Sequence, residues 1–287
     1  MLREIRELGF EYAELSHGTR ISLVSGILEA VSSGEIRISS VHNFCPLPLG
    51  VNTASPNLFQ FSSDRGRERE LAVRHTLKTL EFAEKVGAKA VVLHLGSIEM
   101  RDYTRRLLDL VERGERDSRK YERLCAEMDE KREARKSLHF THVKECLAQI
   151  APEAASRGIK LGAENREAVE ELPIEADFKE LFQSVNNAAL GYWHDTGHAQ
   201  IKENLGLVPH TMHLASLADS LIGMHIHDVR FPGRDHQPPG AGTIDFAALK
   251  PFVTRNHVRV FELSPSLKTE QVRAGFDHIM RLWGPDS

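Results

Sequence analysis

The chain has 287 residues, of which 41% are hydrophobic and 27% are charged, and its formal net charge at pH 7 is −4. This length suits two ordinary domains or one large α/β barrel, and the slightly acidic balance excludes a global positive field that would hold a polyanion. There is no run of about 18 apolar residues and no signal-peptide pattern at the N-terminus, so we expect a cytoplasmic protein that contacts no membrane. The three cysteines, Cys45, Cys125 and Cys146, are far apart and fit reduced thiols better than disulfides or a thiolate zinc site.

Short β-branched runs alternate along the chain with longer amphipathic stretches. In chain order the expected elements are helix 2–10, strand 12–16, helix 21–34, strand 36–44, helix 67–88, strand 89–96, helix 142–158, strand 159–165, helix 178–185, strand 188–195, helix 210–220, strand 222–228, helix 246–254, strand 258–264 and helix 269–283. Residues 45–62 contain prolines and no periodicity, and are expected to form a loop. Strands that alternate with helices in this way indicate βα units and a parallel sheet.

The strand count favours a TIM (β/α)8-type barrel that forms a single domain over residues 1–287. Seven strands are expected where a closed barrel needs eight. Because the chain opens on a helix, the first strand is the one that is missing or replaced by another segment. A flat doubly wound sheet is the alternative, but the chain has no glycine-rich turn of the GxGxxG kind to support it.

Residues 98–140 break this rhythm and are expected to form a charged helical insertion after the fourth strand, when the absent first strand is counted. Between residues 101 and 136 the chain carries 12 Lys or Arg and 10 Asp or Glu in near-alternation. We interpret this region as a pair of solvated helices with salt-bridged faces, since a nucleic-acid groove requires a surplus of positive charge. A lid, or a contact between the subunits of a homo-oligomer, is the alternative, because insertions after barrel strands lie on the active-site face.

Each expected strand ends in a carboxylate or an imidazole. In chain order these residues are Glu14, His42, His94, Glu164, Asp195 with His198, His225 and Glu262, and the loop after strand 222–228 adds Asp235 and His236. Catalytic groups of a TIM barrel come from these strand ends and the loops that follow them. So many carboxylates and imidazoles would repel one another or lose their hydration unless a divalent cation held them. We therefore expect a metal site for Zn²⁺, Mn²⁺ or a related ion.

The stretch GYWHDTGHAQ at 191–200 shows how two such ligands can share one centre. Asp195 is expected to leave its strand end pointing at the metal. Gly197 is expected to let the backbone turn sharply, so that His198 returns to the same centre.

The remaining histidines divide by strand geometry. In MHIHDVR, His225 and His227 share one face of the strand, and we assign His225 to the metal and His227 to a supporting role beside it. Glu14 is expected to accept a hydrogen bond that orients a ligand. His194 should point away from the face of Asp195. Histidines without a spacing signal are expected at the surface or in packing: His17, His75, His139, His142, His210, His213, His257 and His278.

The motifs around these positions resemble the xylose isomerase-like TIM-barrel superfamily, which includes sugar-phosphate isomerases and epimerases and the type 2 apurinic-site endonucleases. The resemblance runs from about residue 2 to the end, apart from 98–140, through the stretches LGFEYAELS, VHNF, VVLHLG, GAENRE, HDTGHA, HIHD, DHQPPGAGTIDF and FELSP. In the isomerases and epimerases it implies one metal, whose ligands correspond here to Glu164, Asp195, His225 and Glu262.

The endonuclease branch implies a cluster of three metals instead. Its additional ligands correspond to His42, His94, His198 and His236. The chain departs from that pattern two positions before His236, where it has Arg234 in place of an aspartate, and Asp235 lies one residue out of register. The resemblance therefore implies one to three ions, of which one or two are well supplied with ligands.

These implications favour a divalent-metal-dependent isomerase or epimerase that acts on a small carbohydrate or sugar phosphate by proton transfer next to a carbonyl. By resemblance, Glu164 and Glu262 are metal ligands and also remove and return the proton, with His198 near the substrate. Candidates for binding the substrate, including an anionic group on it, are Arg166, Arg230, Arg234 and Asp235.

Three alternatives remain. A multi-metal phosphodiester hydrolase of the apurinic-site endonuclease type would use the extra histidines. We rank nucleic acid below a small molecule as the partner, because loops such as HNFCPLPLGVNTASPNL carry no Lys or Arg. A metal-dependent dehydratase or other lyase, or a barrel that keeps its ligands without catalysis, would have the same ligand set.

Overall fold

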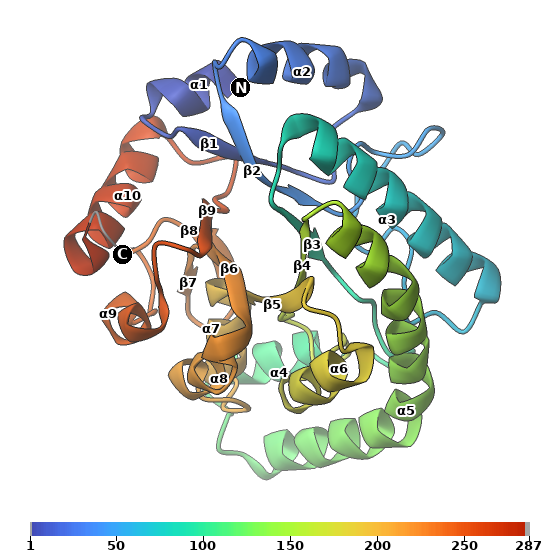
Figure 1. Ribbon diagram of the computed structural model, residues 1–287. Helices are drawn as coiled ribbons and strands as arrows, with labels where there is room; N and C mark the ends of the chain where they lie inside the picture. Colours follow the sequence, from blue (N-terminus) through green and yellow to red (C-terminus); the bar gives the residue numbers. More distant parts are fainter. Residues whose placement is uncertain (1, 285–287) are drawn as a thin grey trace. The chain divides into compact units, whose positions relative to one another are not determined.

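The computed structural model describes residues 2–284 (Figure 1), which divide into two compact units. Unit 1 comprises residues 2–96, 139–164 and 179–191, and unit 2 comprises residues 97–138, 165–178 and 192–284. Three elements have residues in both units, namely α5 (Arg119–Ser156), α6 (Phe178–Val185) and β5 (Leu190–Asp195). The prediction that the chain forms a single domain stays a prediction.

Unit 1 contains four parallel strands in the order β1-β2-β3-β4. Its elements are α1 (Leu2–Glu7), β1 (Tyr12–Leu15), the 3-10 helix η1 (Ile21–Leu23), α2 (Val24–Ser32), β2 (Arg37–His42), α3 (Gly66–Val86), β3 (Ala90–Leu93) and β4 (Lys160–Glu164). The β3 side chains are buried, and α3 packs against β2 and β3 (Figure 1). Because the strands are parallel, their carboxyl ends meet at one edge, where the Asn43 amide donates to the Val92 carbonyl at 2.9 Å.

Unit 2 contains the parallel strands β5, β6 and β9, in that order. Its remaining elements are α4 (Tyr103–Glu112), η2 (Glu175–Asp177), α7 (Thr196–Asn204), α8 (His210–Leu217), η3 (Ala218–Ser220), β6 (Leu221–Ile226), β7 (Asp228–Arg230), β8 (Arg234–Gln237), α9 (Phe246–Leu249), η4 (Lys250–Phe252), β9 (Val258–Phe261) and α10 (Thr269–Trp283). Asp195 at the end of β5 lies opposite His225 on β6, and Glu262 follows the last residue of β9. The three residues therefore reach the same edge of this sheet.

Seven parallel strands are present, as the alternation of patterns predicted, and the part of the chain from 2 to 284 holds no eighth parallel strand. The loop predicted at 45–62 has no helix or strand. The three cysteines are free thiols, and burial raises the pKa of Cys45 to about 12, which keeps it protonated at neutral pH. Among the described residues there is no helix with the length and apolar character needed to cross a membrane.

The segment after β6 differs from expectation. It was predicted to be a loop, but Asp228–Arg230 and Arg234–Gln237 pair as the antiparallel strands β7 and β8. The buried Asp228 carboxylate accepts hydrogen bonds from the amides of Val229, Gly240, Gly242 and Ile244, at 2.8–3.1 Å. This carboxylate holds the loop that follows the hairpin in place. The short polar strands of the hairpin carry no hydrophobic pattern that would predict them from the sequence.

The prediction of two solvated helices over 98–140 was wrong in part. The charged surface contains the expected salt bridges, such as Arg132 with Asp129 at 2.6 Å. However, α4 buries one face, with Tyr103 and Leu107 almost fully covered, and α5 continues without a break through the helix predicted at 142–158. Apolar residues at helical spacing within this charged segment account for the buried face.

Candidate metal centre

In unit 1, three predicted ligands lie together at the carboxyl edge of the sheet. Glu164 Oε2 lies 2.7 Å from His94 Nε2 and 3.6 Å from His42 Nε2. The three side chains are at most about 5% exposed. His42 Nδ1 lies 3.1 Å from the Asn43 carbonyl, a contact that leaves Nε2 as the nitrogen facing Glu164. The set has the chemistry of a divalent-cation site, because neutral imidazole and carboxylate are suitable ligands for such ions.

Glu14 lies on β1, next to this set in the sheet order. Its Oε2 accepts a hydrogen bond of 2.6 Å from the Ser40 hydroxyl. Ser40 is two residues before His42 on β2, so the two side chains share one face of that strand. A role for Glu14 in orienting a ligand stays a prediction.

In unit 2, Asp195, His225 and Glu262 form a second set. His225 Nδ1 lies 3.0 Å from Glu262 Oε2 and 3.6 Å from Asp195 Oδ2. Asp195 and His225 are fully buried, whereas the Glu262 side chain is 33% exposed. Burial alone would raise the pKa of the Asp195 carboxyl, but the imidazoles of His198 and His227 outweigh it and hold that pKa well below its usual range. Asp195 is therefore a carboxylate at neutral pH.

His227 forms a hydrogen bond with the Asp195 carboxylate. Its Nδ1 accepts a hydrogen bond of 3.0 Å from the His236 amide, which makes Nε2 the protonated nitrogen. That Nε2 lies 3.0 Å from Asp195 Oδ2, so the imidazole donates to the carboxylate. The His227 and His236 rings stack with centroids 4.4 Å apart. The atoms of His227, His236 and Glu262 that could bind a metal ion lie within 4.8 Å of one another. His236 has a φ of 51°, a left-handed conformation that turns its ring toward the Glu262 carbonyl, 2.9 Å away.

Gly197 is required for a reason other than the predicted one. Asp195 caps α7 by accepting a 2.7 Å hydrogen bond from the His198 amide, and the helix begins at once, with no left-handed residue at 197. A Cβ on Gly197 would lie 2.0 Å from His227 Cε1. The glycine therefore makes room for the His227 ring.

His198 lies with two carboxylates in a third group. Its Nδ1 lies 3.0 Å from the Asn165 carbonyl, and its donor atoms lie within 4.8 Å of those of Glu167 and Asp235. Burial, and then the nearby Asp235 carboxylate, raise the pKa of Glu167 to about 7. Sequence reasoning missed Glu167, although its position three residues after Glu164 in GAENRE was a usable signal.

Arg166 was predicted to bind an anionic group. It is buried, and its Nε lies 3.2 Å from Glu171 Oε1 while Nη1 lies 3.3 Å from His198 Nδ1. The guanidinium therefore braces the His198 side of the site, and substrate contact by Arg166 stays a prediction.

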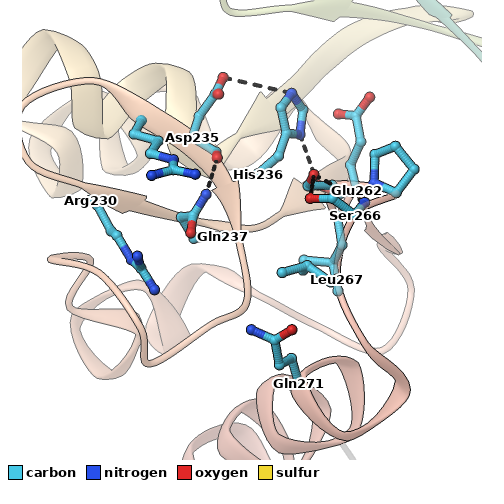
Figure 2. Close-up of a pocket in the computed structure, with 12 residues that line it drawn as sticks. Arg230, Asp235, His236, Gln237, Glu262, Ser266, Leu267 and Gln271 are labelled. Carbon is cyan, nitrogen blue, oxygen red and sulfur yellow. Dashed lines mark hydrogen bonds and ion pairs between the residues drawn. The ribbon is translucent and has the colours of Figure 1, made fainter.

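A pocket of about 560 Å³ opens beside Glu262 (Figure 2). It is lined by Arg230, Arg234, Asp235, His236, Gln237, Glu262, Leu263, Ser264, Pro265, Ser266, Leu267 and Gln271. Figure 2 shows Asp235, His236 and Glu262 at one side of this pocket and Arg230 and Gln271 at the other. Two predicted ligands and three predicted substrate-binding residues therefore line the same space.

A family model described as xylose isomerase-like TIM barrel matches residues 2–278. The match confirms the TIM-barrel fold expected from the sequence. A search of curated protein sequences finds no match to the chain.

Solved structures of sugar epimerases are similar in fold. The 3-keto-D-glucoside 4-epimerase from E. coli has a TM-score of 0.68 at 17% identity, over 98% of this chain and 92% of that one. D-Psicose 3-epimerase from Clostridium cellulolyticum H10, solved with D-tagatose, has a TM-score of 0.68 at 12% identity, with coverages of 98% and 92%. The IOLI protein, solved with a zinc atom, has a TM-score of 0.65 at 15% identity, with the same coverages. At these identities the likeness establishes the fold alone.

Proposed function

Since the chain belongs to the xylose isomerase-like TIM-barrel family, we propose that it is a divalent-metal-dependent epimerase or isomerase of a small carbohydrate. The observation that carries this proposal is the contact of His225 with both Asp195 and Glu262 beside an open pocket. The similar structures named as sugar epimerases support the same class of reaction.

The residues present fit a divalent cation. Two carboxylates and an imidazole converge in unit 2, and a carboxylate and two imidazoles converge in unit 1. Such oxygen and nitrogen donors suit Zn²⁺ and Mn²⁺. We propose Asp195, His225 and Glu262 as ligands, and Glu164 as a further ligand on the strength of the family pattern.

The chemistry requires a proton to leave and return next to a carbonyl. When bound, the cation would polarise that carbonyl and stabilise the charge that develops on its oxygen. The partly exposed carboxylate of Glu262 can take the proton from a substrate in the pocket, and Glu164 is proposed as the second proton-transfer group. His198 Nδ1 lies 3.0 Å from the Asn165 carbonyl, so Nε2 is the ring nitrogen that we propose for contact with a substrate hydroxyl.

Exchange of substrate hydrogen with solvent tests this reaction directly. In D₂O, metal-loaded protein is expected to introduce deuterium next to the carbonyl of a ketose such as D-tagatose or D-psicose. The loss of the corresponding proton signal is measured by ¹H NMR. Glu262→Gln and Glu164→Gln should each lower the exchange rate by at least about a hundredfold, because each removes a proton-transfer group. Glu270→Gln, an exposed carboxylate on α10, is the matched control and should exchange at the wild-type rate.

The second candidate is a multi-metal phosphodiester hydrolase, and the His42–His94–Glu164 set favours it. Elemental analysis separates the two candidates, because one ion per chain is expected for the epimerase and two or three for the hydrolase. Cleavage of abasic duplex DNA without any deuterium exchange in ketoses would replace the first proposal with the second.

A further inference from the structure

Two arginines face each other across the β7–β8 hairpin, at the wall of the pocket. Arg230 and Arg234 are register partners on antiparallel strands, so their side chains project from the same side of the hairpin. Like charges in directly opposed positions destabilise a strand pair. Both side chains are exposed, and neither forms an ion pair with another residue between 2 and 284.

Uncharged hydrogen-bond donors also line the pocket. The Ser264 and Ser266 hydroxyls lie 2.8 Å apart in the turn after β9. Gln271 Oε1 accepts a 2.9 Å hydrogen bond from the Lys268 amide, which leaves the side-chain amide nitrogen as a donor. Arg230 and Gln271 lie on the side of the pocket away from Asp235, His236 and Glu262 (Figure 2). The pocket therefore has two carboxylates and the His236 imidazole on one side and the donors of Arg230 and Gln271 on the other.

The two carboxylates that line the pocket form no ion pair with Arg230 or Arg234. Asp235 Oδ2 lies 3.6 Å from His236 Nε2, and Glu262 Oε2 lies 3.0 Å from His225 Nδ1. Each of these carboxylates therefore has an imidazole beside it. The guanidinium groups are therefore open to an anion that comes from outside the protein.

We propose that Arg230 and Arg234, together with the donors of Ser264, Ser266 and Gln271 that line the same pocket, bind an anionic group on the substrate, either a phosphate or a carboxylate. This inference rests on the proposed function, which places the carbonyl end of the same molecule at Glu262. Guanidinium groups match both anions because they donate two parallel hydrogen bonds to paired oxygens. A pocket of about 560 Å³ is of the size that holds a small ligand. The sugars named for the similar structures are uncharged, so an anion subsite would distinguish this chain from them.

Calorimetric titration of the metal-loaded protein with inorganic phosphate tests the subsite without any turnover. We expect binding in the wild type and a loss of about tenfold or more in affinity for Arg230→Gln and for Arg234→Gln, because each removes a charge-assisted hydrogen bond. Arg255→Gln, an exposed arginine outside the pocket, is the matched control and should bind phosphate as the wild type does. Metal content, measured on the same samples, should be unchanged in all three variants.

Further titrations identify the kind of anion and the place where it binds. D-Fructose 6-phosphate binding more tightly than D-fructose would support a phosphate subsite, and D-glucuronate binding more tightly than D-fructose would support a carboxylate subsite. Equal affinity for all three sugars, equal phosphate affinity in the wild type and the arginine variants, or phosphate binding that disappears only when the metal is removed would each overturn the inference. Arginine-dependent phosphate binding in a protein that exchanges no deuterium would keep the subsite and remove the proposed reaction.

Discussion

Gly197 links the packing of a single residue to the proposed metal ligand Asp195. The space that a Cβ would occupy belongs to the His227 ring, and His227 Nε2 donates to Asp195. A residue without a side chain is therefore part of the support of a carboxylate two positions before it.

Gly197→Ala is expected to destabilise the fold and weaken metal binding together. The added methyl group must displace the His227 ring, and overpacking of a buried site costs about 1–3 kcal/mol. Gly26→Ala is the control, because its Cβ on α2 would meet no atom within 4 Å and alanine favours a helix. Urea unfolding and metal titration of both variants check this prediction. A Gly197→Ala protein with wild-type stability and metal affinity would show that the ring moves at no cost.

Four buried rings form a hydrogen-bonded chain in unit 2. Tyr192 Oη lies 2.7 Å from His194 Nδ1 and 2.9 Å from His213 Nε2, and His194 Nε2 lies 2.9 Å from His210 Nε2. Burial lowers the pKa of His210 to about 3 and that of His213 to about 4. The rings are therefore neutral at physiological pH.

The contribution of His210 and His213 to protein stability is expected to fall as the pH drops from 7.5 to 5. The unfolded chain takes up protons below its histidine pKa of 6.5, whereas folded His210 and His213 do not until the pH approaches about 3 and 4. At pH 5 each histidine therefore lowers the free energy of unfolding by about 2 kcal/mol. Urea unfolding of the wild type and of His210→Gln at both pH values measures this contribution, because the variant lacks the His210 share of about 2 kcal/mol. A change in stability between the two pH values that is the same in the wild type and in His210→Gln would contradict the expected protonation state of His210.

At the scale of elements, the inserted helix α4 is joined to the loop after β4. The Glu170 carboxylate accepts hydrogen bonds from the amides of Tyr103 and Thr104 and, at 2.7 Å, from the Thr104 hydroxyl. The same hydroxyl accepts a 2.8 Å hydrogen bond from the Val169 amide. Glu170 therefore caps the first turn of α4 and holds the loop that carries Glu167.

Glu170→Ala is expected to loosen both segments. Loss of a helix cap costs about 1–2 kcal/mol, and the amides of Tyr103 and Thr104 should exchange faster with solvent. Glu112→Ala, an exposed residue at the other end of α4, should leave that exchange unchanged. Hydrogen exchange followed by mass spectrometry reports both. If the amides stay protected in Glu170→Ala, then α4 is held by its apolar face alone.

At the scale of the whole molecule, the sequence predicted the parallel strands and the polar residues at their ends. Alternating apolar runs and a carboxylate or imidazole at each strand end are local signals, and Asp195, His225 and Glu262 were found from them. The same strand-end pattern also identified His42, His94 and Glu164, whose ligand atoms lie within 4.8 Å of one another in the structure.

The features that sequence patterns missed depend on contacts between distant residues. The hairpin β7–β8 consists of short polar strands, and its order rests on Asp228 and the loop amides that bind it. The buried face of α4 is hidden in text dominated by charge. The raised pKa of Glu167 arises from its burial and then from the carboxylate of Asp235, and both depend on residues far away along the chain.

Anomalous scattering from crystals grown with Mn²⁺ or Zn²⁺ measures the ligand set of unit 2 directly. We expect a peak about 2.0–2.3 Å from carboxylate oxygens of Asp195 and Glu262 and from a nitrogen of His225. This peak should disappear in Asp195→Asn. Full-occupancy ions found elsewhere in such crystals, with no density among these three side chains, would contradict the assignment of this site as the metal centre.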